Sequence, residues 1–159
     1  MSDIAIALAI HVLAIVLWIG GVAMVTTILL PAVRRLKSPA ERVAFFDAIE
    51  RRFAWQARAT SLIAGISGFY LVYRMNLGAM FGAPAFWWLD AMLLVWLIFT
   101  LMLFIAEPLF LHKWFAARAL RAPASTFDLI QRMHWVLLIL SLIAVFGAVA
   151  GVNGLTFFS

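Results

Sequence analysis

Residues 10–21 read Ile10-His11-Val12-Leu13-Ala14-Ile15-Val16-Leu17-Trp18-Ile19-Gly20-Gly21 and lie inside a longer apolar run, residues 4–33. These thirty residues include no charged side chain and one histidine. A helix of about 20 residues crosses the hydrocarbon core of a bilayer, so the run predicts a membrane span. A charged side chain inside a span costs roughly 2.5 kcal/mol or more. We therefore expect His11 to be neutral and to face the protein interior.

The composition agrees with a membrane protein. Hydrophobic residues make up 67% of the chain and charged residues 12%, and the mean hydropathy is +1.09. Soluble domains have about half apolar and a quarter charged residues. Cysteine is absent, which excludes disulfides, thiolate copper sites, iron–sulfur clusters and cysteine nucleophiles. Any metal site must therefore use His, Met, Asp or Glu.

Four apolar segments predict spans at about residues 4–33, 54–75, 86–112 and 127–152. Before the second span, Ser38-Pro39-Ala40-Glu41 has the pattern of a capping box, which indicates a helix start. Apolar residues recur every four positions within 39–53, which predicts an amphipathic helix. The expected fold is an all-α, antiparallel four-helix transmembrane bundle with one cytoplasmic amphipathic helix, in a single domain over residues 1–159.

Basic residues indicate the orientation. Seven follow the first span, and Lys113, Arg118 and Arg121 follow the third, with Arg132 before the fourth. The connection after the second span contains only Arg74. Cytoplasmic connections are enriched in Lys and Arg. We therefore expect the first and third connections to be cytoplasmic and both termini to be periplasmic.

A short internal repeat accompanies this layout. Residues 46–51 (FDAIER) resemble residues 127–132 (FDLIQR), and Pro31 and Pro108 lie upstream in comparable places. The repeat suggests a parallel duplication of a two-helix hairpin, with the halves related by an axis along the membrane normal. Unrelated halves are the alternative.

A first candidate site lies around His11. Counting about 1.5 Å per residue places His11 roughly 10 Å below the outer surface, close to the level of Met92, with Trp18 two turns along the same face. Imidazole binds haem iron and copper, and a thioether binds haem iron or Cu(I). The expected neighbours are Asp90, Tyr70 and Tyr73. The alternative is a neutral histidine that bonds to a backbone carbonyl or a serine.

A second candidate site lies near the inner surface. Glu107 needs a partner to stay ionised in hydrocarbon, and Arg58 is placed to be that partner, with His134 and His112 at a similar depth. The cluster could serve as a proton relay, an anion pocket or a carboxylate–histidine metal site, but a helix–helix clamp is the preferred interpretation. His134 lies roughly 20 Å or more from His11 in depth, so the two are not expected to share one iron.

The pattern of His11, Trp18, Gly20 and Gly21 resembles the first helix of the CopD-like (copper resistance D) family of bacterial integral membrane proteins. The resemblance continues through Arg52-Phe53 and Ser67-Gly68-Phe69-Tyr70-Leu71. It implies copper handling at the bacterial inner membrane, with His11 as a candidate ligand and a periplasmic copper-binding protein or redox partner.

The same pattern is more distantly similar to the HemJ-type protoporphyrinogen oxidases, which are four-helix proteins that bind haem b. That family pairs the first-helix histidine with a lysine early in the third helix. Met92 stands at the matching position here. This departure argues against the oxidase activity and leaves haem binding open.

The expected function is therefore a metal centre, haem b or copper, held through His11 for electron transfer, redox sensing or copper handling. Met92 and His134 are the further candidate metal ligands. The alternatives are a porphyrinogen-oxidising enzyme of the HemJ kind and a metal-free scaffold subunit. The lipid bilayer is the expected surrounding, a homo-oligomer is a further expectation, and nothing in the sequence indicates a nucleic-acid partner.

Overall fold

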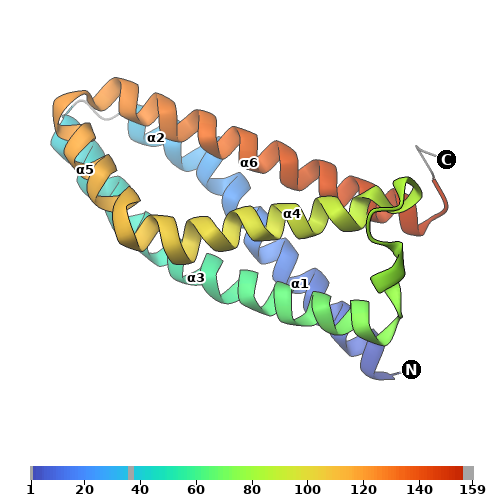
Figure 1. Cartoon of the computed structure of the whole chain (residues 1–159). Helices are drawn as coiled ribbons and strands as arrows, with labels where there is room; N and C mark the ends of the chain where they lie inside the picture. Colours follow the sequence, from blue (N-terminus) through green and yellow to red (C-terminus); the bar gives the residue numbers. More distant parts are fainter. Residues whose placement is uncertain (1, 36–37, 156–159) are drawn as a thin grey trace.

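The computed structural model describes residues 2–35 and 38–155, and this part of the chain is almost entirely helical, with no strand. Both described ends of the chain and residues 75–86 lie at one end of an elongated molecule (Figure 1). Residues 34–35, 38–40 and 121–123 lie at the other end. We call these the terminal end and the turn end.

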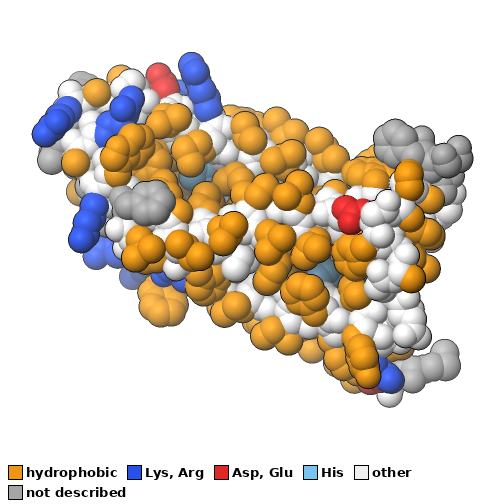
Figure 2. Space-filling model, in the orientation of Figure 1, with side chains coloured by type: hydrophobic (Ala, Val, Ile, Leu, Met, Phe, Trp, Pro, Cys, Tyr) orange, Lys and Arg blue, Asp and Glu red, His pale blue; other side chains and the backbone are white. Residues whose placement is uncertain are grey.

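Among the residues that the structure describes, three helical segments are long and apolar enough to cross a membrane: Ser2–Arg34, Pro84–Leu109 and Ala124–Val152. Large apolar side chains cover the outside of the molecule, as contact with lipid requires (Figure 2). The expectation of a membrane protein with transmembrane helices is confirmed to this extent. The fourth expected span, residues 54–75, is not among these segments.

The first helical rod consists of α1 (Ser2–Met24), η1 (Val25–Leu29) and α2 (Leu30–Arg34). The segment η1, between α1 and α2, is a π-helical turn that ends just before Pro31. At its end the Leu30 backbone N–H donates to Val25 O, five residues earlier. Pro31 has no N–H to donate to the next carbonyl, that of Thr26. Gln131 of α6 supplies the missing donor through its side-chain amide, at 2.7 Å.

The second rod repeats this arrangement. It consists of α4 (Trp87–Leu101), the π-helical η4 (Met102–Leu111) and α5 (His112–Arg121), and Pro108 lies within η4. Five residues before this proline, the carbonyl of Leu103 accepts a hydrogen bond of 3.0 Å from Arg58 Nε of α3. In both rods a proline widens the helix, and a side chain from another helix bonds the carbonyl five residues before the proline.

The longest helix is α3, which runs from Pro39 to Arg74 over 36 residues. Ser38 caps it by accepting from the Glu41 backbone N–H, in agreement with the capping box. The expected amphipathic helix, residues 39–53, and the expected second span form one uninterrupted helix. The chain then passes through two short 3₁₀ turns, Leu77–Met80 and Pro84–Phe86, into α4.

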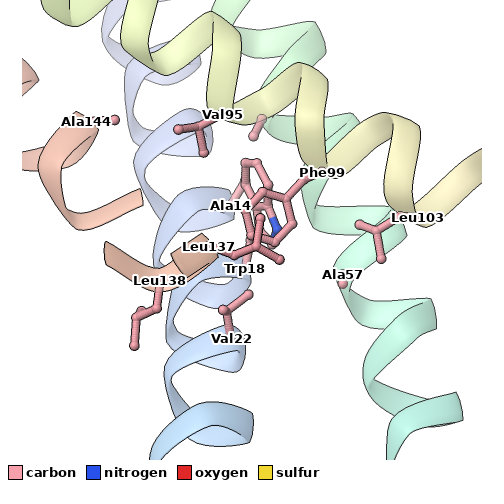
Figure 3. Packing of buried hydrophobic residues seen from close by; sticks show 11 residues of the cluster. Ala14, Trp18, Val22, Ala57, Val95, Phe99, Leu103, Leu137, Leu138 and Ala144 are labelled. Atoms are coloured by element: carbon pink, nitrogen blue, oxygen red, sulfur yellow. The ribbon is translucent and has the colours of Figure 1, made fainter. Parts of the chain in front are cut away.

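The last helix, α6 (Pro123–Val152), packs along α4, and α1 packs along α3. Trp18 lies at the centre of the main hydrophobic cluster, where Leu137 and Leu138 of α6 also contribute (Figure 3). Phe99 of α4 packs edge-on against Trp18, with ring centroids 4.8 Å apart. The core therefore joins both rods.

Two aromatic contacts join residues that lie 81 positions apart in the sequence. Trp18 packs against Phe99, and Phe46 packs against Phe127 with centroids 5.8 Å apart. The same spacing relates other buried residues, namely Ala14 with Val95 and Val22 with Leu103.

Candidate functional site

His11 is partly buried on the face of α1 that meets α3. Its Nδ1 lies 2.9 Å from the Ala64 carbonyl oxygen and 3.1 Å from Ser67 Oγ. A carbonyl only accepts, so Nδ1 carries the proton. The Ser67 hydroxyl donates to Ile63 O at 2.6 Å, and its oxygen is thus also an acceptor for this N–H. The tautomer is fixed, and Nε2 carries a lone pair.

Gly68 makes the close approach of this ring to α3 feasible. A Cβ atom at position 68 would lie 3.0 Å from His11 Cε1, which is tighter than most real contacts. A larger residue would therefore push the imidazole away from Ala64. The glycine, the serine and the carbonyl together form a seat that holds the ring in one orientation.

Further polar contacts hold α1 against α3 on both sides of His11. Toward the terminal end, the Asp3 carboxylate accepts from Arg74 at 2.5 Å and from the Tyr70 hydroxyl at 3.0 Å. Toward the turn end, Gln56 Nε2 donates to the Leu17 carbonyl at 3.3 Å. The position of the His11 ring along the helix pair is therefore well determined.

Trp18 belongs to the core rather than to a pocket at His11. It is 4% exposed and packs against Phe99. Its indole Nε1 is buried and has no hydrogen-bond partner in the described part of the chain. A buried hydrogen-bond donor without an acceptor is unusual in the core of a folded protein.

The other expected neighbours of His11 have different partners. Met92 packs against the core cluster that contains Trp18. Asp90 accepts from the Gly82 backbone N–H at 3.1 Å and so holds the loop before α4. Tyr73 is 79% exposed, and Tyr70 is bonded to Asp3. Within the described residues, no group of three or more His, Asp or Glu side chains could hold a metal ion.

At the second candidate site the structure pairs Arg58 with Glu107. One guanidinium NH₂ donates to Glu107 Oε2, and Nε donates to the Leu103 carbonyl. Both side chains are about one-fifth exposed, so the pair is shielded from solvent. The contacts tie α3 to η4, which is what a helix–helix clamp requires.

His134 is part of a cavity at the turn end. Its Nδ1 donates to Ile130 O of its own helix at 2.9 Å. It lines a cavity of about 110 Å³ together with Glu107 and Glu50. His11 does not line this cavity, so His11 and His134 belong to separate parts of the molecule. The side chain of His112 lies outside the described part of the structure.

A bond from His11 to a backbone carbonyl or a serine was one of the two interpretations of the sequence, and the structure shows both bonds, to Ala64 O and Ser67 Oγ. That these groups belong to α3, and that Gln131 bonds to Thr26, was not predicted, because the sequence does not provide the helix order. Pro31 and Pro108 could have indicated that the carbonyls before them need side-chain donors, since a proline within a helix leaves a carbonyl without its helical donor.

No family model matches the chain, and neither a curated protein nor a solved structure matches it significantly. The CopD-like resemblance therefore stays a prediction based on the residues quoted for it.

Proposed function

We propose that the chain is an inner-membrane protein of the CopD-like kind, an antiparallel four-helix transmembrane bundle in which His11 would hold haem b. The single observation that carries the haem assignment is the hydrogen bond from His11 Nδ1 to Ala64 O, because it leaves Nε2 free for a metal. Metal-ligating histidines almost always donate their other ring N–H to a carbonyl, a carboxylate or water.

Haem fits the residues present better than a copper ion does. Haem iron is held by as little as one protein nitrogen, whereas a copper site needs several side-chain ligands. His11 is only partly buried. A bound haem would supply one-electron chemistry. Ala64 and Ser67 fix the tautomer of His11 by accepting from its Nδ1, and Gly68 leaves room for the imidazole ring against α3.

The distribution of charge supports the proposed bundle and its orientation. Basic side chains gather at the turn end (Figure 2), and Arg74 is the last residue of α3, at the opposite end. The positive-inside rule then makes the turn end cytoplasmic and both termini periplasmic. As the fourth span, α3 would carry Arg58 into the apolar zone, and the pairing with Glu107 reduces the cost of that position. The contacts between residues 81 apart support a duplicated hairpin.

A second candidate is a metal-free subunit in which His11 only joins α1 to α3. The same bonds from Nδ1 to Ala64 and Ser67 favour it, since they satisfy one ring nitrogen without a metal. The two candidates differ in whether Nε2 is used.

Optical spectra and elemental analysis distinguish these candidates. The full chain is expressed with adequate iron and copper, purified in detergent, and measured oxidised and dithionite-reduced. We expect a Soret band with sharp reduced bands and iron near one per chain. His11→Ala should lose these bands, and His134→Ala, the matched control, should keep them. Copper without a Soret band would support the copper interpretation, and neither metal would support the metal-free subunit.

A further inference from the structure

The helix α5 (His112–Arg121) continues the second rod beyond the apolar segment Pro84–Leu109. It is inclined to α4 and lies across the turn end (Figure 1). Phe115 packs against a buried apolar cluster and Ala119 is buried, so this side of the helix faces the protein. The opposite side is exposed. A helix with one apolar and one basic, exposed side is typical of the membrane surface.

The exposed side of α5 combines an aromatic ring with two basic groups. Trp114, Arg118 and Arg121 follow each other at spacings of four and three residues, so they share one face of the helix. Together with Ala117 and Ala122 they line a surface pocket. The Arg118 guanidinium lies over the Trp114 ring, with Cζ 5.4 Å from the ring centroid. Because Trp114 is still 48% exposed, its indole can contact a ligand as well.

The two guanidinium groups of this pocket have no carboxylate partner among the described residues. Three other arginines each have one: Arg34 pairs with Asp128, Arg58 with Glu107 and Arg74 with Asp3. A guanidinium is a planar fork of N–H donors that matches the oxygens of a phosphate. Arg118 and Arg121, one helical turn apart, are therefore complementary to a phosphate group.

The surroundings of α5 favour a phospholipid over a soluble phosphate. The helix follows a segment that is long and apolar enough to cross a membrane. Tryptophan is enriched where a membrane meets water, because its ring is apolar and its N–H is polar. Basic residues next to a span attract anionic lipids. A phospholipid supplies both parts of the required ligand, a phosphate for the arginines and acyl chains for the indole.

We propose that the exposed side of α5 is a binding site for an anionic phospholipid. The lipid phosphate accepts hydrogen bonds from the guanidinium groups of Arg118 and Arg121, and an acyl chain contacts the Trp114 ring. Trp114 also orients the Arg118 guanidinium by stacking against it. A zwitterionic lipid binds more weakly, because its ammonium group places a second positive charge near the two arginines.

Thermal unfolding with two matched lipids tests the proposal. The detergent-purified full chain is titrated with dioleoylphosphatidylglycerol or with dioleoylphosphatidylcholine, which has the same acyl chains and no net charge. A ligand that binds only the folded state raises Tm with concentration. We expect a saturable rise in Tm with phosphatidylglycerol and an apparent affinity at least fivefold lower for phosphatidylcholine. Equal shifts with both lipids, or no shift with either, overturn the proposal.

Glycerol 3-phosphate distinguishes a lipid site from a site for free phosphate. It has the phosphate and glycerol of the lipid and lacks the acyl chains. At the concentration at which phosphatidylglycerol saturates the shift, it should leave Tm unchanged. A shift as large as that with the lipid would show that the acyl chains are not needed and would overturn the assignment to a lipid.

Variants then locate the site. Arg118→Gln/Arg121→Gln removes both guanidinium groups and should weaken the apparent affinity for phosphatidylglycerol about tenfold. Arg35→Gln/Arg132→Gln is the matched control, because it removes the same charge from two exposed arginines that do not line the pocket. The control should bind within about twofold of the native chain.

Equal losses in the two double variants would indicate a general attraction to basic charge and would overturn the site on α5. Undiminished affinity in a folded Arg118→Gln/Arg121→Gln protein excludes it as well. The outcome is independent of haem, since His11 does not line this pocket.

Discussion

The side-chain amide of Gln131 donates a hydrogen bond of 2.7 Å to the backbone carbonyl of Thr26, and both residues are buried. The bond joins α6 to the π-helical turn of the first rod. It exists because Pro31, five residues after Thr26, has no N–H. Pro31 removes one backbone hydrogen bond from the first rod and leaves the Thr26 carbonyl without a helical donor. That carbonyl then accepts the bond from Gln131 that holds α6 in place.

Gln131→Leu should destabilise the protein by about 1–3 kcal/mol, because it leaves the buried Thr26 carbonyl without a donor. Pro31→Ala restores a backbone N–H near this carbonyl, so the cost of Gln131→Leu should be smaller in the Pro31→Ala background. A double-mutant cycle of unfolding free energies in detergent measures the coupling. Additive effects of the two substitutions would show that Pro31 does not create the acceptor that Gln131 serves.

Glu107→Gln and Arg58→Leu should each destabilise by about 3 kcal/mol, since each leaves a shielded charge without its partner. The double variant Arg58→Leu/Glu107→Leu removes both charges and should cost less than the sum of the single variants. Unfolding in detergent gives the three values. A double variant as unstable as the sum would contradict the clamp between α3 and η4.

Gly68→Ala should weaken haem binding while the protein remains folded. The new Cβ would lie 3.0 Å from His11 Cε1 and would move the imidazole away from its seat. Gly20→Ala, on α1, is the control, because a Cβ there would meet nothing within 4 Å. Haem content per chain is the measurement. If both variants lose haem equally, or neither does, the seat on Gly68 does not matter for the cofactor.

The orientation can be mapped by labelling, because the chain contains no cysteine and any introduced thiol is the only one. Ser2→Cys and Asn153→Cys should react with a membrane-impermeant maleimide in intact cells. Ser125→Cys, at the turn end, should react only after the membrane is permeabilised. The opposite pattern would invert the proposed topology, and labelling of Ser2 and Asn153 on different sides would exclude four spans.

Much of the helical layout could be predicted from the sequence, since uninterrupted apolar runs and the cap at Ser38 act locally. The two π-helical turns were not predicted, although Pro31 and Pro108 cause them. The length of α3 was also missed, because nothing in the 39–53 pattern states whether the helix continues into residues 54–75. Helical propensity continues through Phe53, and no Gly or Pro interrupts the chain there.

The candidate sites were predictable only in part. Depth along the spans indicated a partnership of Arg58 with Glu107, because an ion pair needs only the same level and adjacent helices. The partners of His11 could not be found in this way. Ala64 acts through its backbone and Ser67 through a hydroxyl already bonded to its own helix, so neither is distinguishable in the sequence from other small residues of α3.

Haem content with rescue by imidazole is the most direct test of His11 as an axial ligand. Purified native protein should contain haem b near one per chain by the pyridine haemochrome method. His11→Gly should contain almost none, and free imidazole added during expression and purification should restore a haem with the native reduced spectrum. If His11→Gly retains full haem, or the native protein binds none when haem is supplied, His11 is not a haem ligand and its imidazole only joins α1 to α3.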